Sequence, residues 1–172
     1  MIATTKITTI QDADVVADAT KKTGKTLNYH FNQPKMTKEE LIDLLNKDLT
    51  LEYSAAVQYI QHSAKVTGAK YQSIQKELVI HANEEIGHAI ALAEQISYLG
   101  GTPTVDVAER HISDDSTEML KQDLEGEKDA VKRYRLRTMQ ARELGEFGLA
   151  RVLEDILIME EEHERDLAQA LD

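Results

Sequence analysis

The 172-residue chain contains no cysteine and no tryptophan, and it has two prolines, eight glycines and few aromatic residues. Without cysteine it can form no disulfide, thiolate metal site or iron–sulfur cluster, which fits a protein of the reducing cytoplasm. No apolar run reaches the length of a membrane span, and the N-terminus lacks the continuous apolar segment of a signal peptide. Because helix-breaking residues are scarce and Ala, Leu, Glu and Lys are common, the composition favours an all-α protein.

Cationic residues are also scarce, and the net charge is −11. Residues 1–36 are the exception, because five lysines and three aspartates give them a charge of +2 and leave −13 for the remainder. Acidic charge repels the phosphate backbone, so we do not expect the main body to bind nucleic acid. We interpret residues 1–36 as a partly mobile N-terminal extension used in subunit contacts, and residues 37–172 as the folded domain.

Apolar periodicity and helix-terminating residues divide residues 37–172 into four predicted helices. The first begins at the capping box Thr37-Lys-Glu-Glu40 and ends by Gly68. The others cover about 71–99, 115–143 and 147–171. The first and third connections are short, which predicts antiparallel hairpins, whereas residues 100–114 can traverse the whole bundle. We therefore predict an antiparallel four-helix bundle with one long crossover between its second and third helices.

Two Glu-x-x-His pairs, Glu85–His88 and Glu160–His163, stand in the second and fourth predicted helices. Each has a partner glutamate 33 residues upstream, at Glu52 and Glu127, so the four glutamates follow spacings of 33, 42 and 33 residues. Equal spacings predict two structural repeats about a pseudo-twofold axis, which bring the glutamates to one level of the core. This order is the ligand set of a carboxylate-bridged two-metal site inside a four-helix bundle.

The chemistry of these residues points to two divalent cations. Buried carboxylates would each cost roughly several kcal/mol if unpaired, and two divalent cations would neutralise four of them. Oxygen and imidazole ligands without sulfur suit iron or manganese rather than structural zinc. Because an i, i+3 spacing directs both side chains of a pair toward one ion, we assign three ligands to each metal, with Glu85 and Glu160 as bridges. The first set is Glu52, Glu85 and His88, and the second is Glu127, Glu160 and His163.

A lone Glu-x-x-His pair usually belongs to an ordinary helix surface, so the metal interpretation depends on the duplication. Tyr59 and Tyr134 carry a weaker signal, because each lies seven residues after a glutamate on the same helix face. A tyrosine in a bundle most often packs in the core, but it can also hydrogen-bond a metal ligand or donate an electron. Tyr59 is therefore included among the candidate catalytic residues.

The remaining histidines are less informative. His81 shares the face of Glu85, and we expect it to face a cavity or support a ligand rather than bind metal. Asp123 is expected to orient a ligating histidine in the same manner. No repeated pattern accompanies the other three histidines, which we interpret as surface residues: His30, His62 and His111.

With these motifs the chain resembles the bacterioferritins and the wider ferritin-like superfamily over about residues 38–171. The resemblance rests on five segments: Leu51–Tyr59, Glu85–Ala89, Tyr98–Pro103, Met119–Leu124 and Glu160–His163. It implies a ferroxidase in which two Fe(II) ions per subunit reduce O2 or H2O2 and become Fe(III). It also implies that the mineral is stored inside a hollow shell of subunits.

Two departures from bacterioferritin change what the resemblance implies. The position directly after Glu85, where bacterioferritins carry a methionine haem ligand, is Ile86, so we predict no haem. The chain ends nine residues after His163, which leaves no fifth helix of the kind found in 24-subunit ferritins. We therefore expect a twelve-subunit shell, similar to the mini-ferritins and Dps-like proteins.

Two alternative functions remain open. The first is a di-metal oxidoreductase without storage, such as a rubrerythrin-like peroxidase, a manganese catalase or a hydroxylase. The paired tyrosines favour it slightly, whereas the missing cysteines and Ala130, in place of an extra glutamate, disfavour a rubrerythrin. The second is a DNA-protecting mini-ferritin that uses residues 1–36 as its contact. A segment with five lysines and three aspartates is a weak basic arm, and the acidic body opposes DNA binding.

Overall fold

The computed structural model describes residues 36–172, which form four long α-helices and one short 3-10 helix. The α-helices are α1 (Lys38–Lys65), α2 (Gln72–Tyr98), α3 (Ser116–Glu143) and α4 (Phe147–Leu171). The 3-10 helix η1 (Ala69–Tyr71) precedes α2 directly. The predicted N-terminal extension, residues 1–36, lies almost entirely outside the described residues, so this division of the chain stays a prediction. No helix within residues 36–172 has the length and apolar character needed to cross a membrane.

Local hydrogen bonds explain where the helices begin. At the start of α1, the Glu40 amide donates to the Thr37 hydroxyl over 3.1 Å, and the Thr37 amide donates to the Glu40 carboxylate over 2.8 Å. This reciprocal pair is the predicted capping box, and it satisfies two amides that the helix leaves unpaired. Asp115 caps α3 by accepting from the Glu118 amide over 2.8 Å. The first helix ends at Lys65, slightly before Gly68, whose φ of 116° suits glycine and leads into η1.

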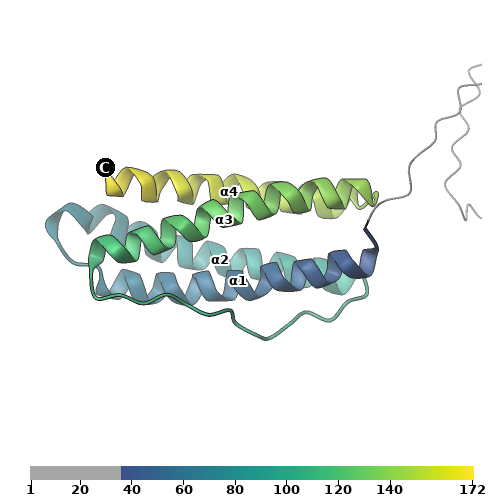
Figure 1. The fold of residues 1–172 in the computed structure, drawn as a ribbon, viewed down its shortest axis with the longest axis horizontal. Coiled ribbons are helices and arrows are strands. Elements are labelled where there is room, and N and C mark those ends of the chain that lie inside the picture. Colours follow the sequence, from purple (N-terminus) through teal and green to yellow (C-terminus); the bar gives the residue numbers. More distant parts are fainter. Residues whose placement is uncertain (1–35) are drawn as a thin grey trace, which may run out of the picture. The chain divides into compact units, whose positions relative to one another are not determined.

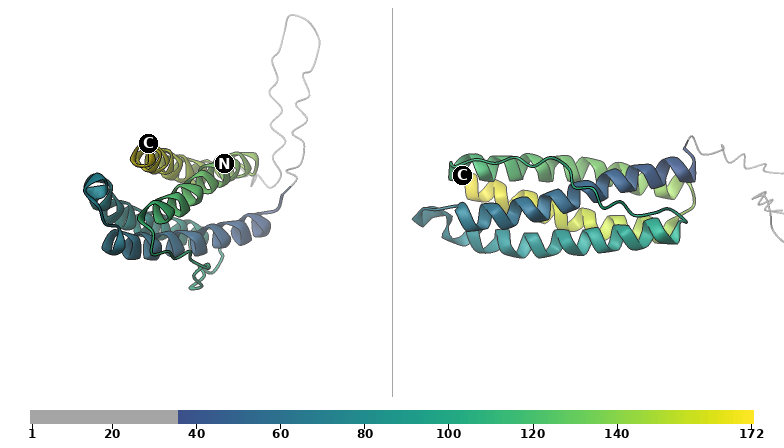
Figure 2. Two further views of the ribbon diagram at one scale, coloured as in Figure 1. Left: turned by 60° about the vertical axis from the view of Figure 1, so that its left-hand side comes forward. Right: turned by 90° about the horizontal axis from the view of Figure 1, so that it is seen from below.

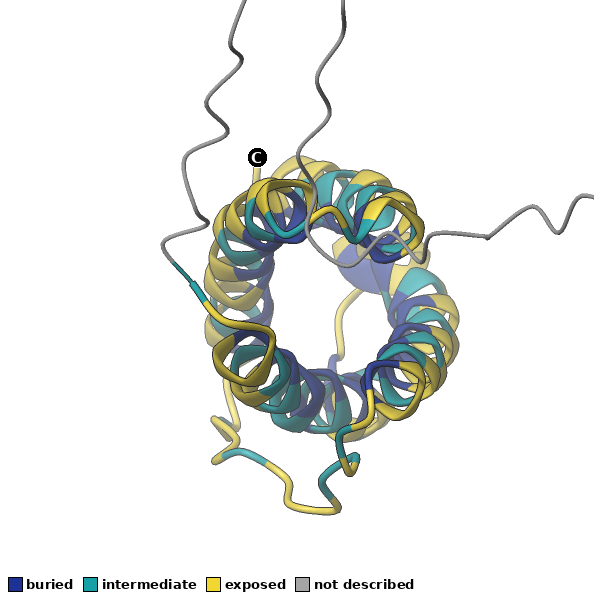
Figure 3. Cartoon of the chain, turned by 90° about the vertical axis from the view of Figure 1, so that its right-hand side faces the viewer, coloured by how far each residue is buried: buried dark blue, intermediate teal, exposed yellow. Residues whose placement is uncertain are grey.

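The helices form two hairpins joined by a long crossover. α1 packs against α2 and α3 against α4, and further contacts of α1 with α3 and of α2 with α4 close a ring of four helices (Figure 3). Residues 99–115 contain no helix or strand and run along the bundle beside α1 (Figures 1 and 2). Hydrogen bonds fasten this crossover to α1, including Ala108 N to Thr50 O at 3.1 Å. The predicted all-α bundle with a long second connection is confirmed.

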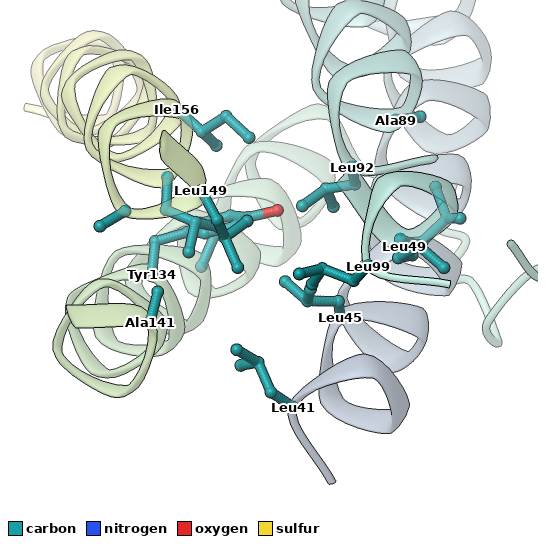
Figure 4. Close-up of a cluster of buried hydrophobic side chains, with 14 residues drawn as sticks. Leu41, Leu45, Leu49, Ala89, Leu92, Leu99, Tyr134, Ala141, Leu149 and Ile156 are labelled. Atoms are coloured by element: carbon teal, nitrogen blue, oxygen red, sulfur yellow. The ribbon is translucent and has the colours of Figure 1, made fainter. Parts of the chain in front are cut away.

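Two apolar clusters fill the ring at different levels. The first includes Leu45, Leu92 and Leu153, and its 14 buried residues are drawn in Figure 4. The second lies around Tyr59, Leu78 and other residues of all four helices. Along every helix, the predicted metal ligands fall between residues of the first cluster and residues of the second. The fold thus encloses one polar layer between two apolar ones.

Candidate metal centre

The structure brings all six sequence-predicted ligands into that polar layer. Each of the six residues is at most 3% exposed. One group of four offers ligand atoms that all lie within 4.8 Å of one another, and a second group does the same. Glu85 and Glu160 belong to both groups, as the assignment of bridging residues requires. We call the six residues the four-glutamate centre: Glu52, Glu85, His88, Glu127, Glu160 and His163.

The two histidines face the carboxylates through the same ring nitrogen. The Nδ1 atom of His88 lies 3.1 Å from Glu160 and 3.2 Å from Glu85. The Nδ1 atom of His163 lies 3.2 Å from Glu85 and 3.8 Å from Glu160. Each shared glutamate therefore meets one histidine of its own helix and one of the opposite hairpin. The arrangement repeats between the two hairpins, and the assignment of three ligands to each metal stays a prediction.

Several buried atoms of the centre lack a hydrogen-bond partner among residues 36–172. Each of the four glutamates has one such oxygen, and the Nδ1 atom of His163 is a fifth case. Their short contacts with one another are not aligned as hydrogen bonds. Buried polar atoms are normally satisfied, and ionised ones left unpaired are costly. Cations would satisfy them, and carboxylate oxygens with imidazole nitrogens suit iron or manganese.

Without cations, protons neutralise part of the centre. Burial and the nearby Glu52 carboxylate raise the pKa of Glu85 to about 7, and burial also raises the pKa of Glu160. For Glu52, contacts with His88 and Glu85 outweigh burial and hold the pKa at about 2. Burial lowers a histidine pKa, but surrounding carboxylates outweigh it, raising the pKa of His163 to about 11 and that of His88 as well. Metal ions that bind to these side chains must therefore displace protons.

The two tyrosines each support a glutamate of the opposite hairpin. The Tyr59 hydroxyl on α1 donates to Glu127 on α3, and the Tyr134 hydroxyl on α3 donates to Glu52 on α1. Both tyrosines are almost completely buried, and burial raises the pKa of each hydroxyl well above its usual value. They therefore remain protonated donors that hold one oxygen of each carboxylate and leave the other free.

Two buried aspartates flank the centre, and the partner of neither was predicted from the sequence. Asp48, one turn before Glu52, accepts from Arg137 Nε over 2.7 Å. Asp123, one turn before Glu127, contacts His62 Nδ1 at 2.8 Å. The interpretation of His62 as a surface residue was wrong, because it is completely buried. Asp123 orients His62 rather than a histidine of the four-glutamate centre.

A signal for these pairs was present in the sequence. Each residue of the centre in the first hairpin has a counterpart of the same type 75 positions later in the second, as Glu52 has in Glu127. The same offset relates Asp48 to Asp123 and His62 to Arg137. Extending the repeat beyond the glutamates would have matched each aspartate with a cationic or imidazole partner on the opposite hairpin.

The Nε2 atoms of the two histidines, which lie on the ring side away from Nδ1, have different neighbours. His163 Nε2 lies 2.9 Å from a Glu84 carboxylate oxygen, whereas His88 Nε2 lies 3.5 Å from the Met159 sulfur. His81 is buried, and its ring stacks on that of His163 with centroids 4.0 Å apart. Among the remaining histidines, His111 is exposed and His30 lies outside the described residues.

A pocket of about 520 Å³ connects the centre to the surface between α1, α3 and the crossover. All four glutamates of the centre line its inner part. Further out, acidic residues such as Glu118, Glu125 and Asp129 outnumber the basic Lys121 and Arg133. A passage of this character attracts cations.

Comparison with known proteins agrees with this arrangement. The family model for the ferritin-like domain matches residues 42–172, which include every residue of the centre. The chain belongs to the ferritin-like family. It is 31% identical over 134 residues to a bacterioferritin of Streptomyces coelicolor, a match that covers 77% of this chain and 80% of that protein. It is 30% identical to a bacterioferritin of Brucella melitensis, over 77% of this chain and 83% of the relative.

Solved structures of ferritin-like proteins match the bundle closely. A ferritin-like diiron-carboxylate protein of Bacillus anthracis is 37% identical with a TM-score of 0.75, covering 80% of this chain and 100% of that one. A dodecameric thioferritin of Bacteroides fragilis, described as bacterioferritin-related, is 32% identical with a TM-score of 0.74, covering 81% and 88%. The chain is thus a ferritin-like protein with a buried carboxylate–histidine cluster suited to two metal ions.

Proposed function

We propose that this ferritin-like chain binds two iron ions at the four-glutamate centre and oxidises Fe(II) to Fe(III). The observation that carries the proposal is the duplicated, buried set of four glutamates and two histidines, in which five ligand atoms have no hydrogen-bond partner among the described residues. Four ionised carboxylates balance two divalent cations, so occupancy removes the electrostatic cost of burying them. Membership of the ferritin-like family supports iron as the metal.

Each residue of the centre has a specific role in this proposal. Glu52 and His88 would hold one ion, Glu127 and His163 would hold the other, and Glu85 and Glu160 would contact both. Tyr59 and Tyr134 keep the two outer carboxylates oriented through their hydroxyl groups. The apolar layers on both sides exclude water, which strengthens the interaction of the ligands with the cations.

The bound iron supplies the electrons for the reaction. Two Fe(II) ions give two electrons to O2, which takes up two protons and becomes H2O2, or to H2O2, which takes up two protons and becomes water. The acidic pocket between α1, α3 and the crossover is the route by which Fe(II) reaches the centre. Side chains that carry protons before metal binding release them as Fe(II) enters.

We further propose that the oxidised iron is stored in a hollow shell of twelve subunits. The dodecameric assembly of the Bacteroides fragilis relative supports this number. That protein is described as a thioferritin, whereas this chain contains no cysteine. Any contribution of thiol groups is therefore absent here, and the oxidation depends on the carboxylate and imidazole ligands.

The test is aerobic addition of excess Fe(II), followed by size exclusion and measurement of iron per subunit in the protein peak. We expect rapid formation of Fe(III) and far more than two irons per subunit in a large assembly. Glu160→Gln should slow the oxidation strongly, whereas the control Glu162→Gln, at an exposed position of the same helix, should not. Two irons or fewer in a dimer-sized peak would refute storage, and equal rates in both variants would refute oxidation at the centre.

A further inference from the structure

A second group of metal-ligating side chains lies outside the four-glutamate centre, between α2 and α4. Glu77, His81 and Asp166 each offer one ligand atom, and these three atoms lie within 4.8 Å of one another. Glu77 and His81 stand one turn apart on the same face of α2. Asp166 comes from α4, which packs beside α2. Its carboxylate oxygen lies 3.5 Å from His81 Nε2.

His81 is the buried member of the group, and its hydrogen-bonding capacity is unused. It is 2% exposed, and its Nδ1 atom has no hydrogen-bond partner within residues 36–172. Its Nε2 contact with Asp166 is longer than a normal hydrogen bond. Burying an imidazole in this way is unfavourable unless another partner satisfies it. Nε2 is the nitrogen that faces Asp166, so a cation held by the two carboxylates would satisfy that atom.

The group is accessible from the surface. Glu77 and Asp166 line a pocket of about 490 Å³ together with Lys70, Ser73, Gln169 and apolar neighbours. The Asp166 side chain is 38% exposed, and Glu77 is half-buried. A hydrated cation in the pocket would thus meet two carboxylates first and the buried imidazole behind them.

We propose that Glu77, His81 and Asp166 form a third divalent-cation site, separate from the four-glutamate centre. Two carboxylates and one imidazole neutralise a divalent cation and leave coordination positions for water, a ligand set that suits iron, manganese or zinc. Each helix contributes from a rigid segment, so the site needs no rearrangement of the backbone. Cation binding here does not depend on oxidation at the centre.

The third site is positioned to exchange ions with the centre. His81 also belongs to a group with Glu84 and His163, whose ligand atoms lie within 4.8 Å of one another. His163 in turn faces the shared glutamates through Nδ1. Side chains capable of binding metal therefore continue from the α2–α4 pocket to the centre. This role rests on the proposed function. In it, the third site holds iron that moves between the centre and the α2–α4 pocket.

The experiment is anaerobic equilibrium dialysis of the full chain against Co(II), with metal counted per subunit. Wild-type protein should bind three ions, two at the centre and one at the third site. The double variant Glu77→Gln/Asp166→Asn should bind two, and Glu162→Gln should keep three. Both substituted carboxylates are partly exposed, and circular dichroism would show that the variant keeps its helices. Equal counts for wild type and the double variant would overturn the proposal.

Failure of the third site and failure of the centre give different counts. A wild-type count of two, unchanged in the double variant and lowered in Glu160→Gln, would refute the third site and leave the centre intact. A wild-type count of one, lost in the double variant and kept in Glu160→Gln, would support the third site and refute the centre. Anomalous scattering from Co(II)-soaked crystals would place the third ion between α2 and α4, and its absence there would also overturn the proposal.

Discussion

The hydroxyl of Tyr59 donates a hydrogen bond to the carboxylate of Glu127 across the bundle, from α1 to α3. Tyr134 does the same in the opposite direction, toward Glu52. Each hairpin therefore orients the unshared glutamate of the other hairpin, Glu52 or Glu127. The positions of Glu52 and Glu127 therefore depend on how the two hairpins pack against each other.

Replacing one tyrosine by phenylalanine should weaken one metal position. Tyr59→Phe removes the donor to Glu127 and should lower the affinity for the ion held by Glu127 and His163 by about tenfold, the lower range for loss of a group that orients a ligand. Tyr134→Phe should have the matching effect on the ion held by Glu52. Calorimetric titration with Mn(II) would measure both constants. Unchanged affinities in both variants would show that the hydroxyl groups do not orient the ligands.

The two metal positions should also differ in affinity. A carboxylate that accepts from the outer nitrogen of a ligating histidine makes the histidine a stronger ligand, and Glu84 does so for His163 whereas His88 faces Met159. Glu84→Gln should weaken one of the two Mn(II) binding steps by about tenfold. Met159→Leu serves as the matched control at the equivalent place in the repeat and should leave both steps nearly unchanged. Similar effects from both substitutions would contradict this account.

Metal binding should weaken as the pH falls. Without metal at pH 7, the raised pKa values of His88 and His163 keep a proton on each, and Glu85, with a pKa of about 7, is about half protonated. Burial also raises the pKa of Glu160, which favours its protonated form. Binding of two ions must displace these protons, at least about two per subunit at pH 7. Raising the pH above 7 removes the proton from Glu85 beforehand and strengthens binding. Titration of the released acid in weak buffer tests this, and binding without proton release would contradict it.

The buried ion pair beside the centre should be important for stability. Asp48 contacts Arg137 at 2.7 Å and Arg133 at 2.9 Å, and Arg137 is 6% exposed. Asp48→Ala leaves a buried guanidinium without its partner and should lower the free energy of unfolding by about 3 kcal/mol. The control Asp43→Ala removes an exposed aspartate of the same helix and should change stability by less than about 0.5 kcal/mol. Urea denaturation measures both, and equal midpoints would contradict the role of the pair.

The helices and their order could be predicted from the sequence because the signals for them are local. Thr37 with Glu40, and Asp115 with Glu118, cap helices through residues three positions apart. The ligands could be predicted to converge because a duplicated spacing constrains them, even though they lie on four helices. His62 could not be placed in this way, because its burial against Asp123 depends on how α1 rotates toward α3. The same is true of Glu77, His81 and Asp166, which have no counterpart pattern in the other hairpin.

The most direct test of the central claim is to locate the metal. Crystals soaked anaerobically with Fe(II) would be measured at the iron absorption edge, with Glu160→Gln crystals treated in parallel. We expect two anomalous peaks about 3.5–4 Å apart within the four-glutamate centre, each beside one histidine, with Glu85 and Glu160 between them. At least one of these peaks should disappear in Glu160→Gln. A single peak, no peak in the centre, or two peaks unaffected by Glu160→Gln would contradict the assignment of a di-metal centre.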